Sequence, residues 1–221
     1  MKRRSTTPWK KSRTYGDLYG GRARRRFADN IFARAHSLQR PADGQHLPVL
    51  LQDNPSRDYV FPVSVEEVAA ALECLPAHHR EGITHIWLRK RARRECGPDA
   101  SLAEFSCGSG VRVVVLYAWP ADGALQLGRR KPPPGEIAHF LRYQGVLIQK
   151  RGNWAIHFDT AALRRFYLEH LLCHEVGHHV DWYARQWSKA NSKEVEAAAD
   201  QYAYAWGPLV GGKIVDAVPS S

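Results

Sequence analysis

Two histidines four residues apart, within one long segment of helical periodicity, constrain the fold of this chain more than any other feature. Apolar residues recur at helical spacing through residues 159–187, where Gly177 is the only glycine or proline. His174 and His178 project from one face of such a helix about 6 Å apart, so both imidazoles can bind one metal ion. Glu175 lies between them and can reach a water molecule on that metal. The segment predicts a metal-binding helix, and the alternative is an accidental histidine pair on a surface helix.

A third protein ligand is needed for a metal site that leaves one position open to water. His179 is the only histidine after His178, and it points about 100° around the helix, which excludes the three-histidine site with an extended His-x-x-Gly-x-x-His tail. A carboxylate must therefore serve. The carboxylates that follow the motif are Asp181, Glu194, Glu196, Asp200 and Asp216.

Glu196 and Asp200 are the preferred pair among these carboxylates. They are four residues apart on a separate predicted helix, and the alanines between them permit a close approach of two helices. Glu196 can then complete the metal site, while Asp200 accepts a hydrogen bond from the non-ligating nitrogen of a histidine ligand. Asp181 shares the face of the two histidines but lies about 4.5 Å further along the helix axis. The alternative for the pair is that both are solvated charges on a helix.

Local signals predict the remaining elements of an α+β domain. Ser64 and Glu67 form a capping box, and Asp159 can cap the long helix. A turn signal over residues 120–123 is of the hairpin kind and indicates a partly antiparallel sheet. The predicted elements are a helix over 64–75, strands over 83–88, 111–119, 124–127, 146–149 and 154–158, the long helix over 159–187, and a final helix over 191–206 that stops at Gly207-Pro208. We expect a basic arm over 1–45, a linker over 46–63 and a folded domain over 64–221.

The net charge of +10 is concentrated at the N-terminus, because nine of the ten excess positive charges lie within residues 1–43. Trp9, Tyr15 and Tyr19 are interleaved with these cations, a mixture that suits phosphates and unstacked bases. We therefore expect the arm to bind nucleic acid, and the alternative is a solvated tail without a ligand. The residues expected to contact nucleic acid are Arg3, Arg4, Lys10, Lys11, Arg22, Arg24, Arg25 and Arg26.

Cysteine usage and hydropathy indicate a cytoplasmic protein that is not inserted in a membrane. The 4 cysteines include no Cys-x-x-Cys pair, so neither a disulfide framework nor a cysteine zinc cluster is indicated. The longest apolar run, over residues 111–119, is far shorter than the roughly 18 residues of a membrane span. The basic N-terminus is not followed by the apolar stretch of an export signal.

The residues His174-Glu175-Val176-Gly177-His178, followed by Glu196-Ala197-Ala198-Ala199-Asp200-Gln201-Tyr202-Ala203, resemble the gluzincin zinc metallopeptidases. The second motif is similar to that of the compact minigluzincins and of the metallopeptidases that accompany phage-type repressors. The resemblance covers about two thirds of the chain, from Ser64 to Trp206. It implies a compact zincin-like core: a supporting helix, a small mixed sheet with an antiparallel edge strand, the metal helix and a following glutamate helix.

The resemblance also implies a role for each motif residue. His174, His178 and Glu196 are the expected ligands of a Zn²⁺ ion, Glu175 the general base, and Asp200 the orienting partner of His174. The implied activity is a zinc metalloendopeptidase that cleaves peptide bonds in flexible or unfolded protein segments. A second hypothesis is a nucleic-acid-binding or regulatory protein whose metallopeptidase-like core binds zinc but cleaves little.

One part of the gluzincin pattern has little room in this chain. Larger gluzincins carry a downstream His, Tyr or Arg that stabilises the oxyanion, whereas only 21 residues follow Asp200 here. Possible substitutes, each of which can instead be a packing residue, are Tyr202, Tyr204, Tyr183 and His157.

Overall fold

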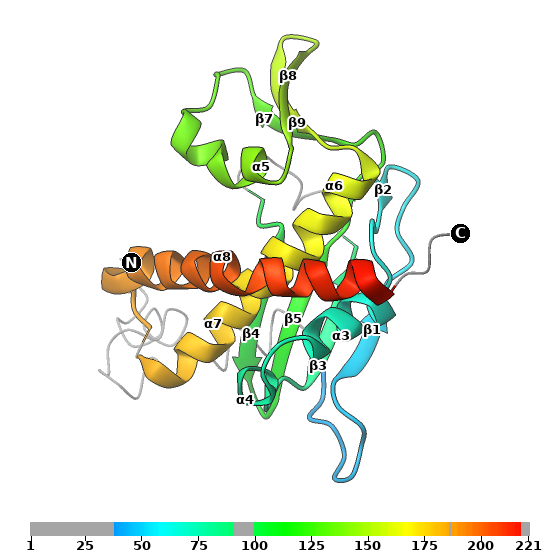
Figure 1. Cartoon of the computed structure of the whole chain (residues 1–221), viewed down its shortest axis with the longest axis vertical. Coiled ribbons are helices and arrows are strands. Elements are labelled where there is room, and N and C mark those ends of the chain that lie inside the picture. Colours follow the sequence, from blue (N-terminus) through cyan, green and yellow to red (C-terminus); the bar gives the residue numbers. More distant parts are fainter. Residues whose placement is uncertain (1–37, 91–99, 186, 218–221) are drawn as a thin grey trace, which may run out of the picture.

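The computed structural model describes residues 38–90, 100–185 and 187–217, in which helices pack on a four-stranded mixed sheet (Figure 1). In spatial order the strands of this sheet are β1 (Val49–Gln52), β3 (His85–Arg89), β5 (Val111–Tyr117) and β4 (Ala103–Gly108). β1, β3 and β5 run parallel, and β4 lies antiparallel at one edge. The predicted α+β class and mixed sheet are confirmed. β1 was missed, and it lies within the segment expected to be a linker.

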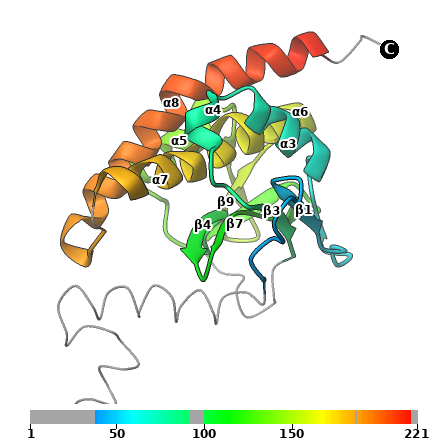
Figure 2. The ribbon, with the colours of Figure 1, turned by 90° about the horizontal axis from the view of Figure 1, so that it is seen from below.

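Both faces of the central strand β5 are buried, as its nearly continuous apolar sequence requires. Val114 and Leu116 belong to the main core, which the helices cover. Val113 and Val115 lie in a smaller cluster on the other face, against Trp87. Figure 2 shows α3 (Val65–Glu73), α7 (Leu172–Ala184) and α8 (Ser192–Ala217) on the same side of the sheet. The main core therefore lies between this sheet and the helices.

The first helix, α3, forms for the reason that the sequence predicts. The Ser64 hydroxyl accepts a hydrogen bond from the backbone N–H of Glu67, and the Glu67 carboxylate accepts one from the backbone N–H of Ser64. Glu67 also pairs with Arg164 of the later helix α6 (Thr160–Arg165). A short helix, α4 (Ala77–Arg80), follows α3. The cap thus ties the start of the domain to the segment that leads into the two histidines.

The predicted long helix is present but contains a π-helical segment. α6 is capped by Asp159, whose carboxylate accepts from the backbone N–H of Ala162 at 2.7 Å. It continues through the π-helical segment η3 (Phe166–Leu171) into α7, which ends at Ala184. In η3 the backbone N–H of Leu172 bonds to the carbonyl of Tyr167, five residues back. The apolar periodicity of the sequence does not show this change of helix type.

The final helix runs further than the sequence predicts. A single turn, η4 (Lys189–Asn191), precedes α8, which passes Gly207 and Pro208 and ends at Ala217. Tertiary packing accounts for this correction: a Cβ atom at Gly207 would collide with the backbone carbonyl of Glu169 in η3. Glycine here allows close helix contact rather than ending the helix, and the ring of Pro208 lies on the exposed side. No helix among the described residues is long and apolar enough to cross a membrane.

A second layer of strands extends from the main body, and it corrects the predicted hairpin. The turn over residues 120–123 exists, since the N–H of Gly123 bonds to the Pro120 carbonyl. However, β5 and the strand that follows the turn lie in different sheets. The additional elements are β2 (Tyr59–Val60) paired with β6 (Trp119–Pro120), the sheet β7 (Ala124–Gly128), β9 (Asn153–His157) and β8 (Val146–Lys150), the turn η2 (Pro134–Ile137), and α5 (Ala138–Arg142). A short apolar run bounded by turns does not reveal its partner strand, which is why the pairing was predicted wrongly.

Most of the predicted basic arm lies outside the described residues. Residues 1–37, with all eight basic residues expected to contact nucleic acid, lie outside the described residues. Nucleic-acid binding by the arm therefore stays a prediction.

Replacing Gly207 by alanine tests the close packing of α8 on η3. The added methyl group meets the Glu169 backbone, so we expect the free energy of unfolding to fall by about 1–3 kcal/mol. Gly212→Ala on the same helix is the matched control, because no atom lies within 4 Å of its Cβ position. That change should be neutral or stabilising by up to about 1 kcal/mol. Urea unfolding of both variants measures the difference, and equal stabilities would contradict the packing.

Candidate metal centre

Three potential ligand atoms converge where α7 crosses α8. His174 and His178 project from α7, and Glu196 projects from the first turns of α8. The ligand atoms of the three residues all lie within 4.8 Å of one another. Glu196 Oε2 is 3.4 Å from His174 Nε2 and 3.7 Å from His178 Nε2. The structure therefore brings together the three side chains that the sequence singles out as a ligand set.

The spacing of these atoms fits a tetrahedral metal ion. Ligands at about 2.1 Å from a tetrahedral centre are separated from each other by about 3.4 Å. The two distances from Glu196 are close to that value, and both histidines present the same nitrogen, Nε2, to it. The Glu196 side chain remains 63% exposed, so the centre opens to solvent on the side of α8. Three protein ligands with an open side are the arrangement of catalytic rather than structural metal sites.

Asp200 orients one of the two histidines. Its Oδ1 lies 2.9 Å from His174 Nδ1, so that Nδ1 donates and Nε2 is left to face the centre. This is the orienting role expected for Asp200 from the resemblance. His178 has no such support, because its Nδ1 is buried without a hydrogen-bond partner among the described residues.

The electric field at the centre favours positive charge. Burial lowers the pKa of His174, but the hydrogen bonds to Asp200 and Glu196 outweigh it and raise this pKa to about 10. Hydrogen bonds from the histidines in turn lower the pKa of the Glu196 carboxyl. The same carboxylates that hold a proton on His174 can therefore stabilise a divalent cation in its place.

Glu175 is a carboxylate beside the centre, close enough to interact with His174, His178 and Glu196. Its side chain is buried, with 5% of the residue surface exposed. Burial raises its pKa, although the two neighbouring histidines act against this shift. The backbone N–H of Phe105 in β4 hydrogen-bonds to its carboxylate. Glu175 thus joins the metal helix to the edge strand of the sheet.

The crossing of α7 and α8 depends on the absence of a side chain at Gly177. A Cβ atom there would lie 2.9 Å from the Cα of Ala199 and 2.9 Å from the Cβ of Tyr202. The backbones approach closely because glycine faces the small residue Ala199, which is fully buried. Gly177 lies between His174 and His178 in sequence, and Ala199 lies about one turn after Glu196 on α8. Gly177, a variable position of the His-Glu-x-x-His motif, therefore serves the packing of α7 against α8.

Asp181, the alternative third ligand, is engaged elsewhere. Its Oδ2 accepts a hydrogen bond from Trp187 Nε1 at 2.9 Å, and its Oδ1 lies 2.6 Å from Arg185 Nε. These bonds hold the chain where it leaves α7. Trp187 then packs edge-on against His178, with ring centroids 5.2 Å apart. Asp181 supports the site by fixing this indole.

Two of the four residues considered as oxyanion stabilisers have other partners, and a third is exposed. The Tyr202 hydroxyl lies 2.8 Å from His79 Nδ1, and Tyr183 packs under the Arg112 guanidinium at 4.8 Å. His157 is an exposed residue of β9. Tyr204 stacks on His170, whose ring is 5.9 Å from that of His174. Only Tyr204 is therefore linked to the centre, through one intervening ring.

Sequence reasoning missed two features beside the centre. His170 lies one turn before His174 and stacks on His139 of α5, with centroids 5.5 Å apart. Burial lowers the pKa of His170 to about 3, so this ring is neutral, and its Nδ1 has no partner among the described residues. The strand β4 was missed although Phe105 stands in an alternating apolar and polar run, which is a usable strand signal.

No family model, no curated protein and no solved structure matches this chain. The resemblance noted from the sequence rests on the residues of the centre and the elements that carry them.

Replacing Glu196 by glutamine tests the ligand set. We expect the full-length chain to bind one divalent metal ion and Glu196→Gln to weaken that binding more than about 100-fold, because a charged ligand is lost. Glu194→Gln is the matched control, since Glu194 is an exposed acid two residues earlier on α8. Titration against a chromophoric chelator measures both affinities. Metal loss in Asp181→Asn with retention in Glu196→Gln would show that the third ligand is misassigned.

Replacing Gly177 by alanine tests whether the helix crossing sets the geometry of the centre. The methyl group pushes the Ala199 backbone away, so we expect metal affinity to fall by about tenfold or more with every ligand intact. Gly212→Ala, with open space at its Cβ position, should bind metal as the unaltered chain does. Unchanged affinity in Gly177→Ala would mean that the crossing tolerates a wider spacing.

Proposed function

We propose that this chain is a zinc-dependent metalloendopeptidase. The observation that carries the proposal is the convergence of His174, His178 and Glu196 on one point, with the buried carboxylate of Glu175 beside it. Two imidazoles and one carboxylate are a ligand set of catalytic zinc, and the exposed side of Glu196 leaves room for water and substrate. Bound there, zinc supplies a water of near-neutral pKa and polarises a carbonyl group.

The residues of the chain divide the remaining work. Glu175 accepts the proton of the attacking water and delivers it to the nitrogen of the departing amine. Asp200 holds the His174 ring in the tautomer that presents Nε2. Trp187 packs edge-on against His178 and supports the position of that ring. The His170 ring lies 5.9 Å from that of His174 and stacks on Tyr204.

The position of β4 supports an extended peptide as substrate. β4 is an edge strand of the four-stranded sheet, and Phe105 within it contacts Glu175 through its backbone N–H. An extended segment that adds to this edge by main-chain hydrogen bonds passes the base and the metal ligands. A folded domain cannot offer such a segment, so flexible or unfolded protein segments are the proposed substrates.

The arrangement of elements agrees with the gluzincin resemblance. α3 is a supporting helix, β4 an antiparallel edge strand, α7 the helix with both histidines, and α8 the helix with Glu196. This order is the plan of a minimal zincin-like core, which supports membership of that class.

A second candidate is a zinc-binding regulatory protein that cleaves little. It is favoured by the placement of Tyr202 and Tyr183, whose side chains are engaged with His79 and Arg112 rather than with the centre. A centre without an oxyanion donor loses about 10²–10³ in rate.

Replacing Glu175 by glutamine distinguishes the two candidates. Hydrolysis of an unstructured protein such as denatured casein should fall by about 10²–10⁴-fold, because the base is lost while the ligands remain. Zinc content should stay at one ion per chain. Glu194→Gln changes the charge equally and is the control, which should retain activity. A chelator should abolish the activity of the unaltered chain. Stoichiometric zinc without any turnover in the unaltered chain would favour the regulatory candidate.

A further inference from the structure

Two runs of basic residues that are distant in sequence meet at the outer end of the three-stranded sheet. Residues 129–131 follow β7 directly, Lys150 ends β8, and Arg151 begins the turn between β8 and β9. The strand register pairs Gly128 with Trp154 and Lys150 with Asn153, which places both runs at the same end. We name this group the basic tip; its members are Arg129, Arg130, Lys131, Lys150 and Arg151.

The basic tip is exposed and poorly neutralised. All five side chains are exposed, and the acid within ion-pair distance of the tip among the described residues is Asp122, 2.8 Å from Lys150. The described part of the chain carries equal numbers of basic and acidic side chains, so this excess is local. Like charges gathered at one end repel each other. Such a cluster is compensated when a polyanion binds it.

The surroundings of the tip add hydrogen-bond donors to its charge. A shallow pocket of about 330 Å³ is lined by Asp122, Gln126, Lys150, Arg151 and Asn153. The amide groups of Gln126 and Asn153 and the two cations can donate to phosphate oxygens. Lys131 is held in place over the ring of Trp154, with Nζ 5.3 Å from the centroid. The tip therefore combines exposed cations with neutral hydrogen-bond donors.

We propose that the basic tip binds the phosphate backbone of duplex nucleic acid. A duplex carries one negative charge per about 1.7 Å, a density that matches several cations on one narrow projection. An anionic membrane is a poorer fit, because the tip has no exposed large apolar side chain to insert. The exposed large apolar residues nearest in sequence are Val146, at the opposite end of β8, and Leu141, on α5. The contacts are to the backbone, so binding is independent of base sequence.

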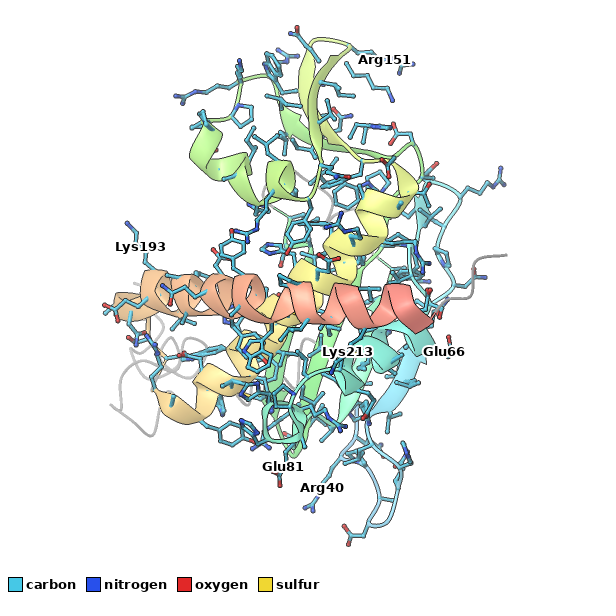
Figure 3. All side chains as sticks on the ribbon, in the orientation of Figure 1. Arg40, Glu66, Glu81, Arg151, Lys193 and Lys213 are labelled. Atoms are coloured by element: carbon cyan, nitrogen blue, oxygen red, sulfur yellow. The ribbon has the colours of Figure 1, made fainter. Side chains whose placement is uncertain are left out.

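The tip and the candidate metal centre are formed by different elements. Figure 3 shows Arg151 at the outer end of the sheet, whereas Lys193 and Lys213 project from α8. The candidate metal ligands lie on α7 and α8, so the tip and the centre share no residue. The proposal holds whether or not the centre cleaves peptides.

Paired charge removal in the full-length chain tests the proposal. One variant carries Arg130→Gln with Arg151→Gln, and the matched control carries Lys193→Gln with Lys213→Gln, which removes the same charge from exposed sites on α8. The probe is a fluorescein-labelled DNA duplex of random sequence, about 20 base pairs long, titrated by anisotropy between about 50 and 200 mM salt. Because the arm is present in every protein, its contribution cancels in the comparison.

We expect the tip variant to bind at least tenfold more weakly than the unaltered chain at the lowest salt, and the control to change less than about twofold. Loss of two phosphate contacts should also reduce the slope of log affinity against log salt by about two, with no change in the control. Equal affinities and slopes in the two variants would overturn the proposal. It is also overturned if the tip variant keeps its affinity for the duplex but loses binding to a polyglutamate probe, since the partner is then an acidic protein. Unfolding curves and metal content, expected to be unchanged, confirm that both variants fold.

Discussion

The contact between Gly177 and Ala199 is the constraint on which the centre depends. It lets two helix backbones approach so closely that a carboxylate of α8 reaches two imidazoles of α7, with Glu196 only 3.4 Å from His174. The contact continues along α8, where Gly207 and Gly211 lie against Glu169 of η3. Small residues at intervals on one helix therefore fix the crossing, and the crossing fixes the ligand geometry. The chemistry of the site rests on packing as much as on ligand identity.

Charge is separated within a folded body that is close to neutral. Glu175, Glu196 and Asp200 gather around the two histidines, whereas five cations gather at the outer end of the three-stranded sheet. The acidic group favours a bound cation, and the basic group favours a bound polyanion. Because the two lie on different elements, each can be occupied without the other.

Local signals predicted the elements that local interactions stabilise. The caps at Ser64 and Asp159 are hydrogen bonds within three residues, and the ligand set follows from spacing along two helices. The missed features depend on distant partners. Pro208 is tolerated within α8 because the helix is held by its contacts with η3, and β1 forms because it pairs with β3. The π-helical turns of η3 leave no trace in apolar periodicity.

η3 has a consequence for how this chain can vary in length. A π-helical turn holds more residues than an α-helical one, so η3 determines how the side chains of α7 are rotated about the helix axis relative to those of α6. Removal or insertion of one residue between Asp159 and His174 would rotate the histidine face by about 100° relative to α6. The loop between β7 and η2 can change in length without such an effect. Tolerance of insertions should therefore be high around the outer sheet and almost absent along the segment that links the cap to the metal ligands.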